Sequence, residues 1–222
     1  MFVLTKHILQ TFKNLKQEEI FSILSGGREV FKNFISSICH LLCSDVHLSL
    51  KNLTIRLLLT MATVYCDLNN NIFAESLMSV YVFDALIDLL NNPYYQQREG
   101  HLILLLLVIL LNYKKSGANP YVMKLSIVDN EAILNGYSAV ISGQLIEFNK
   151  HYEALSVESK KGVFSTLSTM VGNIFSSEEL TSNCLFDKPE TFMKINTVLL
   201  AFYEAVLLNR NFILLLTTVS FI

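Results

Sequence analysis

The stretch "GHLILLLLVILLNYKK", residues 100–115, decides the fold, because it holds ten consecutive apolar residues from Leu102 to Leu111. Ten residues of α-helix rise about 15 Å, half of the roughly 30 Å needed to cross a bilayer. Polar residues flank the run, with Gln96–Glu99 before it and Asn112 and Lys114 after it. A helix that is apolar on every side is one surrounded by other helices. We therefore predict that Leu102–Leu111 forms the core of an all-α protein.

The composition of the 222-residue chain narrows the class of protein. Apolar residues make up 52% and charged residues 16%, an apolar excess over ordinary soluble domains. A membrane-embedded helical protein and one part of a longer helical array both fit this excess. The net charge of −2 offers no basic surface for nucleic acid. The N-terminal segment has no uninterrupted apolar stretch of the kind that secretory signals carry, so we expect a cytosolic chain.

Helical periodicity dominates the sequence, and only three prolines and eight glycines interrupt it. We treat residues 1–222 as a single helical domain with a surface loop over 176–189. Asp45 and Asp129 are the expected start signals of the helices that follow them. Gly26-Gly27 is the expected C-cap of the first helix. The pattern predicts helical segments at 2–24, 28–42, 46–66, 72–78, 80–90, 94–113, from 129 onward, 158–175 and 192–212, and a short segment at 121–128.

Apolar stripes indicate which helix faces are buried. Gly136 and Gly143 lie seven residues apart, and we expect both to allow a close helix approach. The predicted stripes are Val30, Phe34, Ile38 and Leu41 in the second helix; Ile133, Tyr137, Val140, Ile141, Leu145 and Phe148 in the helix from 129; and Phe164, Leu167, Val171, Ile174 and Phe175 in the next.

Three segments of the chain resemble one another: "SLKNLTIRLLLTMATVYCD", "REGHLILLLLVILLNYKK" and "INTVLLAFYEAVLLNRNF". Each opens with polar residues, continues densely apolar and closes near Cys66, Asn112 or Asn209. These spacings match one and two units of somewhat more than 40 residues, the period of armadillo and HEAT repeats. Such units stack because none can bury its own apolar face. The sequence thus predicts an armadillo/HEAT-like right-handed α-solenoid, with an irregular helical bundle as the alternative.

Cysteine and histidine cluster at Cys39, His40, Cys43 and His47, so we weighed a metal site. On one helix, Cys39 and His47 lie about 12 Å apart along the axis, whereas zinc ligands converge to bonds of about 2.0–2.3 Å. A chain break at Ser44 is the one way to fold His47 back toward the thiols. Packed thiols and surface histidines are the preferred interpretation. Cys66 and Cys184 complete four irregularly spaced cysteines, which do not form a disulfide framework.

No catalytic, cofactor-binding or metal-binding residue is predicted. No Ser/His/Asp or Cys/His arrangement has a supporting turn motif, although a spatial pairing of His with Ser or Cys would signal a hydrolase. Tyr94 and Tyr95 follow a turn and are the one candidate for contact with a partner.

The run "NYKKSGANPYVMKLSIVDNEAILNGYSAVISGQLIEFNKHY", residues 112–152, resembles the armadillo-like helical domain-containing protein 3 family. The likeness recurs in "QREGHLILLLLVILLNY", "FSTLSTMVGNIF" and "VLLAFYEAVLLNRNF" and covers roughly residues 48–212. It is fainter before Lys51. The resemblance implies that this chain corresponds to an N-terminal portion of a longer family chain.

The resemblance also implies a function. A non-enzymatic α-solenoid scaffold is expected on the cytosolic face of the Golgi membrane, with a role in Golgi organisation. A Golgi phosphatidylinositol 4-kinase is the partner that the family implies, and neither nucleic acid nor a cofactor is expected. The family supplies no catalytic residues to carry over.

Overall fold

The computed structural model describes residues 19, 22, 26–63, 71–78, 82–113, 118–172 and 189–219, with backbone alone for 154–172, 189–192 and 219. Every element in this part of the chain is a helix, which confirms the predicted all-α class. Outside the described residues lie Cys66, Cys184, the predicted helix 2–24 apart from residues 19 and 22, and the predicted loop 176–189 apart from Pro189. The helices are α3 (Arg28–Cys43), α4 (Leu48–Thr63), α5 (Ile72–Met78), α6 (Val82–Leu89), α7 (Pro93–Arg98), α8 (Gly100–Leu111), α9 (Pro120–Ile127), α10 (Glu131–Gly172), α11 (Pro189–Leu208) and α12 (Arg210–Val219).

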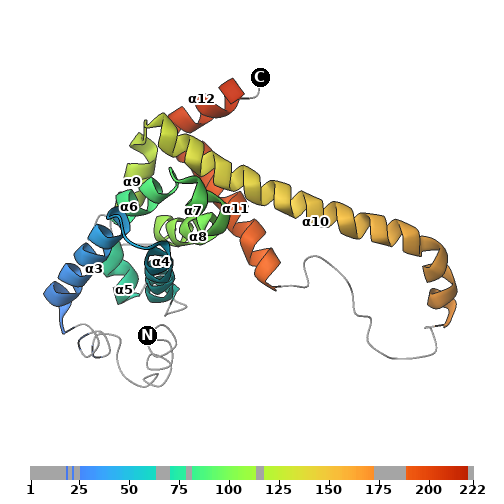
Figure 1. The fold of residues 1–222 in the computed structure, drawn as a ribbon, viewed down its shortest axis with the longest axis horizontal. Helices are drawn as coiled ribbons and strands as arrows, with labels where there is room; N and C mark the ends of the chain where they lie inside the picture. The colour runs from blue at the N-terminus through green and yellow to red at the C-terminus, as the bar shows by residue number, and fades with distance from the viewer. Residues whose placement is uncertain are drawn as a thin grey trace.

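Helix α8 is the centre of the core, as its sequence predicts. It packs between α4 on one side and α11 on the other, with further contacts to α6, α7, α9 and α10 (Figure 1). Ile103, Leu104 and Leu106 are fully buried, and the least covered of the ten apolar residues are still largely buried. Each fully buried Leu or Ile stabilises the fold by about 1.5–3 kcal/mol. The Leu102–Leu111 stretch is therefore enclosed by protein.

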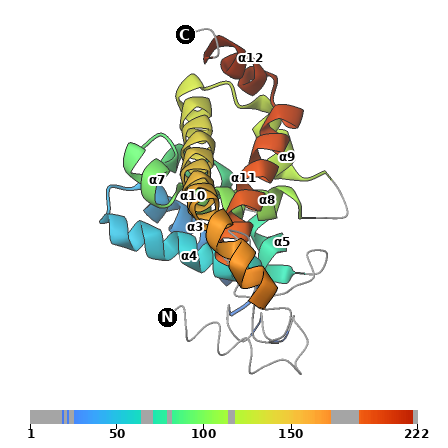
Figure 2. The same cartoon turned by 90° about the vertical axis from the view of Figure 1, so that its right-hand side faces the viewer.

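The three similar segments of the sequence lie side by side in space. They form α4, α8 and α11, and α8 contacts both of the others. A second row of contacts links α3 to α6, and α6 and α7 to the first half of α10. Beyond that half, α10 extends away from the other helices (Figures 1 and 2). Segments far apart in the sequence thus share one interior because each has a similar apolar composition.

Several predicted details of the helix ends were wrong. The 94–113 helix is divided at Glu99 into α7 and α8, because Gly100 packs so close to α10 that a Cβ there would lie 2.7 Å from Val140. The 192–212 helix is divided at Asn209, where α11 and α12 meet at 107°. The two helices expected from 129 and at 158–175 are one helix, α10, since residues 150–158 contain neither Gly nor Pro.

The start signals also moved by a few positions. Helix α4 begins at Leu48, and the Nδ1 atom of His47 accepts from the Ser49 amide 3.3 Å away, so Asp45 does not cap it. The cap of α10 is Asn130, whose Oδ1 accepts from Ala132 N at 3.0 Å. At the predicted C-cap, Gly26 and Gly27 both adopt positive φ, and Gly26 N donates to Ser22 O at 3.0 Å.

The predicted apolar face was right for residues 133–148 of α10 and right only in part for α3. In α10, Tyr137, Val140 and Ile141 are buried, and Ile133, Leu145 and Phe148 are half-buried. In α3, the predicted Ile38 is buried and Leu41 is half-buried, but Val30 and Phe34 are exposed. Two neighbouring stripes of α3 are apolar, and α5 and α6 cover only one of them. That buried stripe consists of Phe31, Ile35, Ile38 and Leu42.

Candidate functional site

The outer side of α11 presents the densest row of exposed apolar side chains on one described helix. We call this row the open face of α11. The opposite side of the helix, with Val198, Ala201 and Ala205, is buried. A surface helix ordinarily pairs a buried apolar stripe with a polar outer face, and an uncovered apolar patch of this kind marks an interaction site. The open face comprises Met193, Leu199, Leu200, Tyr203 and Leu207, which are 38–64% exposed.

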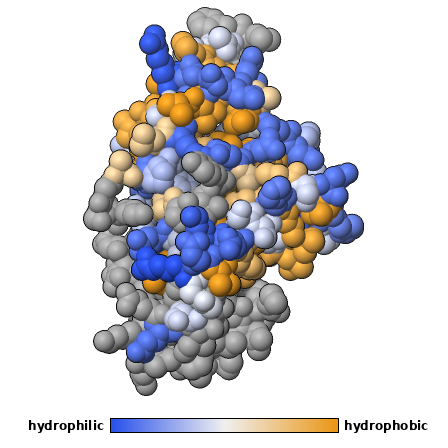
Figure 3. Space-filling view, turned by 90° about the vertical axis from the view of Figure 1, so that its left-hand side faces the viewer, coloured by the Kyte–Doolittle hydropathy of each residue, from blue (hydrophilic) through white to orange (hydrophobic). Residues whose placement is uncertain are grey.

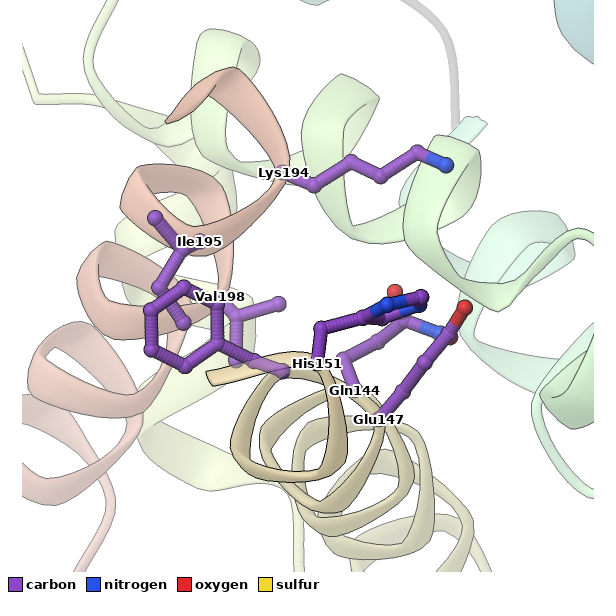
Figure 4. Close-up of a pocket in the computed structure, with 7 residues that line it drawn as sticks. Gln144, Glu147, His151, Lys194, Ile195 and Val198 are labelled. Atoms are coloured by element: carbon purple, nitrogen blue, oxygen red, sulfur yellow. The ribbon is translucent and has the colours of Figure 1, made fainter. Parts of the chain in front are cut away.

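A small pocket lies between α10 and α11. His151, Glu147 and Gln144 reach from α10 toward the side of α11 that carries Lys194 (Figure 4). Its volume is about 120 Å³, enough for about four water molecules and well below the roughly 300 Å³ of a typical small-molecule site. No Ser or Cys is among its described lining residues, so His151 has no nucleophile beside it there. The pocket is suited to water rather than to a substrate.

Glu204 is a buried carboxyl group in the middle of α11. Its side chain is 7% exposed, and its Oε1 accepts a hydrogen bond from the Asn112 amide at the end of α8. Its Oε2 has no hydrogen-bond partner. Burial raises the pKa of Glu204 to about 7, against the smaller lowering effect of the Asn112 hydrogen bond. The hydroxyl of Tyr137 lies in the same interior and donates to Ala201 O at 3.2 Å, and burial raises the pKa of Tyr137.

A second buried carboxylate, Glu99, joins α4 to the start of α8. It accepts from Asn52 Nδ2, and its Oε2 lies 3.6 Å from a guanidinium nitrogen of Arg56. Arg56 also donates to Asn52 Oδ1 at 2.7 Å. Sequence reasoning missed Glu99 and Glu204. The signal for Glu204 was a single acid inside "LLAFYEAVLL", where the helical pattern leaves it no polar face. Both acids tie helices together and are closed to a substrate.

The cysteines and histidines considered as a metal site, Cys39, His40, Cys43 and His47, do not converge on one point in the structure. Cys39 is half-buried, Cys43 and His40 are exposed, and His47 bonds to the backbone of Ser49. Within the described ranges, no three side chains of the His, Cys, Asp or Glu type come together to hold a metal ion. Helix α3 continues through Cys43, so the two thiols lie one turn apart on its surface.

The predicted partner-contact pair is divided between surface and core. Tyr94 is 37% exposed, and the Arg98 guanidinium lies 5.2 Å from the centre of its ring. Tyr95 is buried, and its ring packs edge-on against that of Tyr94 at 5.5 Å. Only Tyr94 is thus accessible to a partner.

Fold and surfaces define the class of protein: an all-α chain whose described part has a stacked helical core and an apolar face open to other molecules. Comparison with known proteins gives the relatives. The chain is 40% identical over 202 residues to armadillo-like helical domain-containing protein 3 of Xenopus laevis. It is 36% and 39% identical over 217 residues to the proteins of that name from Homo sapiens and Danio rerio.

The match covers 89–96% of this chain and 28–30% of those relatives. The chain is therefore homologous to armadillo-like helical domain-containing protein 3 over nearly all of its own length, and it spans less than a third of those proteins. This confirms the resemblance seen in residues 48–212. No family model and no solved structure matches the chain.

Proposed function

We propose that this chain is a non-enzymatic α-solenoid scaffold that binds other proteins. The observation that carries the proposal is the open face of α11. Helix α8 is covered by a similar helix on each side. Helix α11 packs against α8, α9, α10 and α12 but exposes a row of apolar residues on its remaining side. Stacked repeats leave such a face wherever a further helix is meant to dock. The relatives' name, which includes an armadillo-like helical domain, supports the same architecture.

We further propose that the scaffold acts on the cytosolic face of the Golgi membrane and takes part in recruiting a phosphatidylinositol 4-kinase. The support for this location and partner is the likeness of residues 112–152 to the family, together with the homology over most of the chain. This chain spans less than a third of its relatives. The proposal is therefore that this portion of the family chain contains the kinase contact.

Co-immunoprecipitation of the tagged chain with the lipid kinase tests both proposals. We expect the kinase to co-precipitate with the wild-type chain and to be lost with the double variant Tyr203→Ser/Leu207→Ser, which removes two side chains more than half exposed. The control is Ile146→Ser, because Ile146 is a similarly exposed apolar residue on α10. If only a longer family chain brings the kinase down, the contact does not belong to this portion.

A membrane-embedded role is the second candidate function. In the described part of the chain, no single helix has the length and apolar composition to cross a membrane. The segments Met193–Leu208 and Arg210–Thr218 meet those criteria only as a pair, bent by 107°. Carbonate extraction of membranes separates the candidates. Release of the chain into the supernatant supports the scaffold, and retention in the pellet supports the embedded protein.

A further inference from the structure

A groove separate from the α11 face lies where α3, α6, α9 and the start of α10 meet. Its volume is about 550 Å³, room for the inward side chains of about two turns of a docked helix. Figure 3 shows the side of the molecule that carries α3 and α9, where hydrophobic and hydrophilic surfaces alternate. The groove is thus larger than the His151 pocket and differs from it in composition.

The groove has an apolar floor and an apolar rim. Phe83 and Ile87 of α6 are buried at its base, and Ile133 of α10 is half-buried. Ile127, the last residue of α9, is 74% exposed at the rim. An Ile so exposed gains little from the fold itself, whereas a partner that covered it would remove apolar surface from water.

The described lining of the groove has a net negative charge. Among these residues, Asp84, Asp88 and Asp129 stand against one cation, Lys124, whose ammonium group already pairs with Asp84. The carboxylate of Asp88 accepts from a neutral group, the amide of Asn91 at 3.1 Å. The C-terminal ends of α3 and α9 also lie at the groove and carry partial negative charge. The positive N-terminal end of α10 opposes them, but Asn130 caps it and Asp129 adjoins it.

We propose that this groove binds a basic amphipathic helix from a partner protein. The apolar floor accommodates the apolar stripe of such a helix, and Asp88 and Asp129 attract the lysines or arginines that flank the stripe. The bond from Asn91 to Asp88 carries no charge, and Lys124 pairs with Asp84 instead. The carboxylates of Asp88 and Asp129 can therefore still accept from a cationic side chain. The inference rests on the proposed scaffold function, because it specifies the kind of partner that the scaffold binds. It places that partner at a site distinct from the open face of α11.

Fluorescence anisotropy with a labelled synthetic peptide tests the groove. The probe is an amphipathic peptide of Leu and Lys of about 14 residues, close to four helical turns. We expect the purified wild-type chain to bind it, to ignore a matched peptide of Leu and Glu, and to lose affinity as salt is raised. The double variant Asp88→Asn/Asp129→Asn should bind about three- to tenfold more weakly. Ile127→Ser should weaken binding about fivefold.

The controls are Glu153→Gln and Ile146→Ser, since each removes an exposed group of the same kind from α10 away from the groove. Circular dichroism verifies that every variant keeps its helix content. A second readout is alkylation of Cys43, an exposed thiol that lines the groove. Bound Leu/Lys peptide should slow it. Equal binding of the two peptides, unchanged affinity in the groove variants, or weakening by the controls would overturn the proposal.

The outcome is independent of the kinase experiment. Peptide binding that is lost in the groove variants, alongside failure of kinase co-precipitation, leaves the groove standing and rejects the kinase proposal. The reverse result, with kinase capture that depends on Tyr203 and Leu207 but no peptide binding, keeps the scaffold and rejects the groove.

Discussion

Among single residues, Glu204 is a carboxyl group buried in the described core. Its carboxyl group is desolvated between α8 and α11, and one oxygen is without a hydrogen bond. Burial raises its pKa in the folded protein to about 7, from an ordinary value of 4.5. The folded state therefore binds this proton more tightly than the unfolded chain does. Stability from this group is greatest at low pH and falls as pH rises between about 4.5 and about 7.

The variant Glu204→Gln should remove this pH dependence. We expect the free energy of unfolding of the wild type, relative to the variant, to fall by about 1–3 kcal/mol between about pH 5 and about pH 7.5, because one unit of pKa shift is worth about 1.4 kcal/mol. Urea denaturation at several pH values measures it. Parallel stability curves for the two proteins would show that Glu204 ionises as freely in the fold as outside it.

Two glycines of α10 provide a matched test of close packing. A Cβ on Gly136 would lie 2.2 Å from the carbonyl oxygen of Leu90, whereas a Cβ on Gly143 meets nothing within 4 Å. We expect Gly136→Ala to destabilise the fold by about 3 kcal/mol or more, because backbone atoms must move. Gly143→Ala should stabilise it by up to about 1 kcal/mol through helix propensity. Thermal denaturation measures both variants, and equal melting temperatures would contradict the packing at Gly136.

At the scale of elements, two buried asparagines, Asn71 and Asn209, and the half-buried Asn119 connect the helices. Asn71, Asn119 and Asn209 each cap the helix that follows with Oδ1 and donate through Nδ2 to carbonyl groups of a different helix end. Asn209 accepts from Phe212 N at 2.8 Å and donates to Leu125 O and Val128 O at 2.6 and 2.8 Å. One side chain thereby starts α12, ends α9 and fixes the bend after α11.

Replacing the amide by a carboxylate isolates the second role of Asn209. Asp caps helices as well as Asn does, but it cannot donate and would place a negative charge against two carbonyl oxygens. We expect Asn209→Asp to lower the free energy of unfolding by about 2–4 kcal/mol. Asn130→Asp is the control, because Asn130 caps α10 through Oδ1 and its side chain is exposed to water; it should change stability by less than about 0.5 kcal/mol. Equal losses in the two variants would mean that the donor bonds add nothing.

The sequence predicted the features of the helices that depend on local composition and missed those that depend on distant contacts. Long apolar runs placed α4, α8 and α11 correctly because composition alone requires burial. The breaks at Glu99 and Asn209 were not predictable, since each depends on a partner far along the chain: Val140 for Gly100, and Leu125 and Val128 for Asn209. The face of α3 was predicted only in part for the same reason. Its sequence offers two stripes, and the packing of α5 and α6 selects one of them. One such contact is that of Phe31 with Phe73, with ring centres 5.7 Å apart.

For the molecule as a whole, the candidate surfaces were less predictable than the core. The absence of a catalytic motif directed attention to binding, but Tyr94 was the one exposed contact residue inferred from the sequence. The α11 face escaped notice because Tyr203 and Leu207 look like core residues in a periodic helix. The groove escaped because Asp88, Lys124 and Asp129 lie on three segments. Surfaces of this kind become visible only when the stacking order of the helices is known.

That stacking order makes a prediction for the stability of the whole fold. Helix α8 is enclosed by helices from both halves of the chain, so its amides can exchange only when most of the described core opens. Helix α12 contacts only α10 and α11 extensively and exposes Ile213 and Leu214. Native-state hydrogen exchange should therefore protect Leu104–Leu110 at least about a hundredfold more than residues 212–218, a difference of about 3 kcal/mol in opening free energy. Comparable exchange in the two helices would mean that α8 opens locally, and a helix that opens locally is not the centre of one cooperative stack.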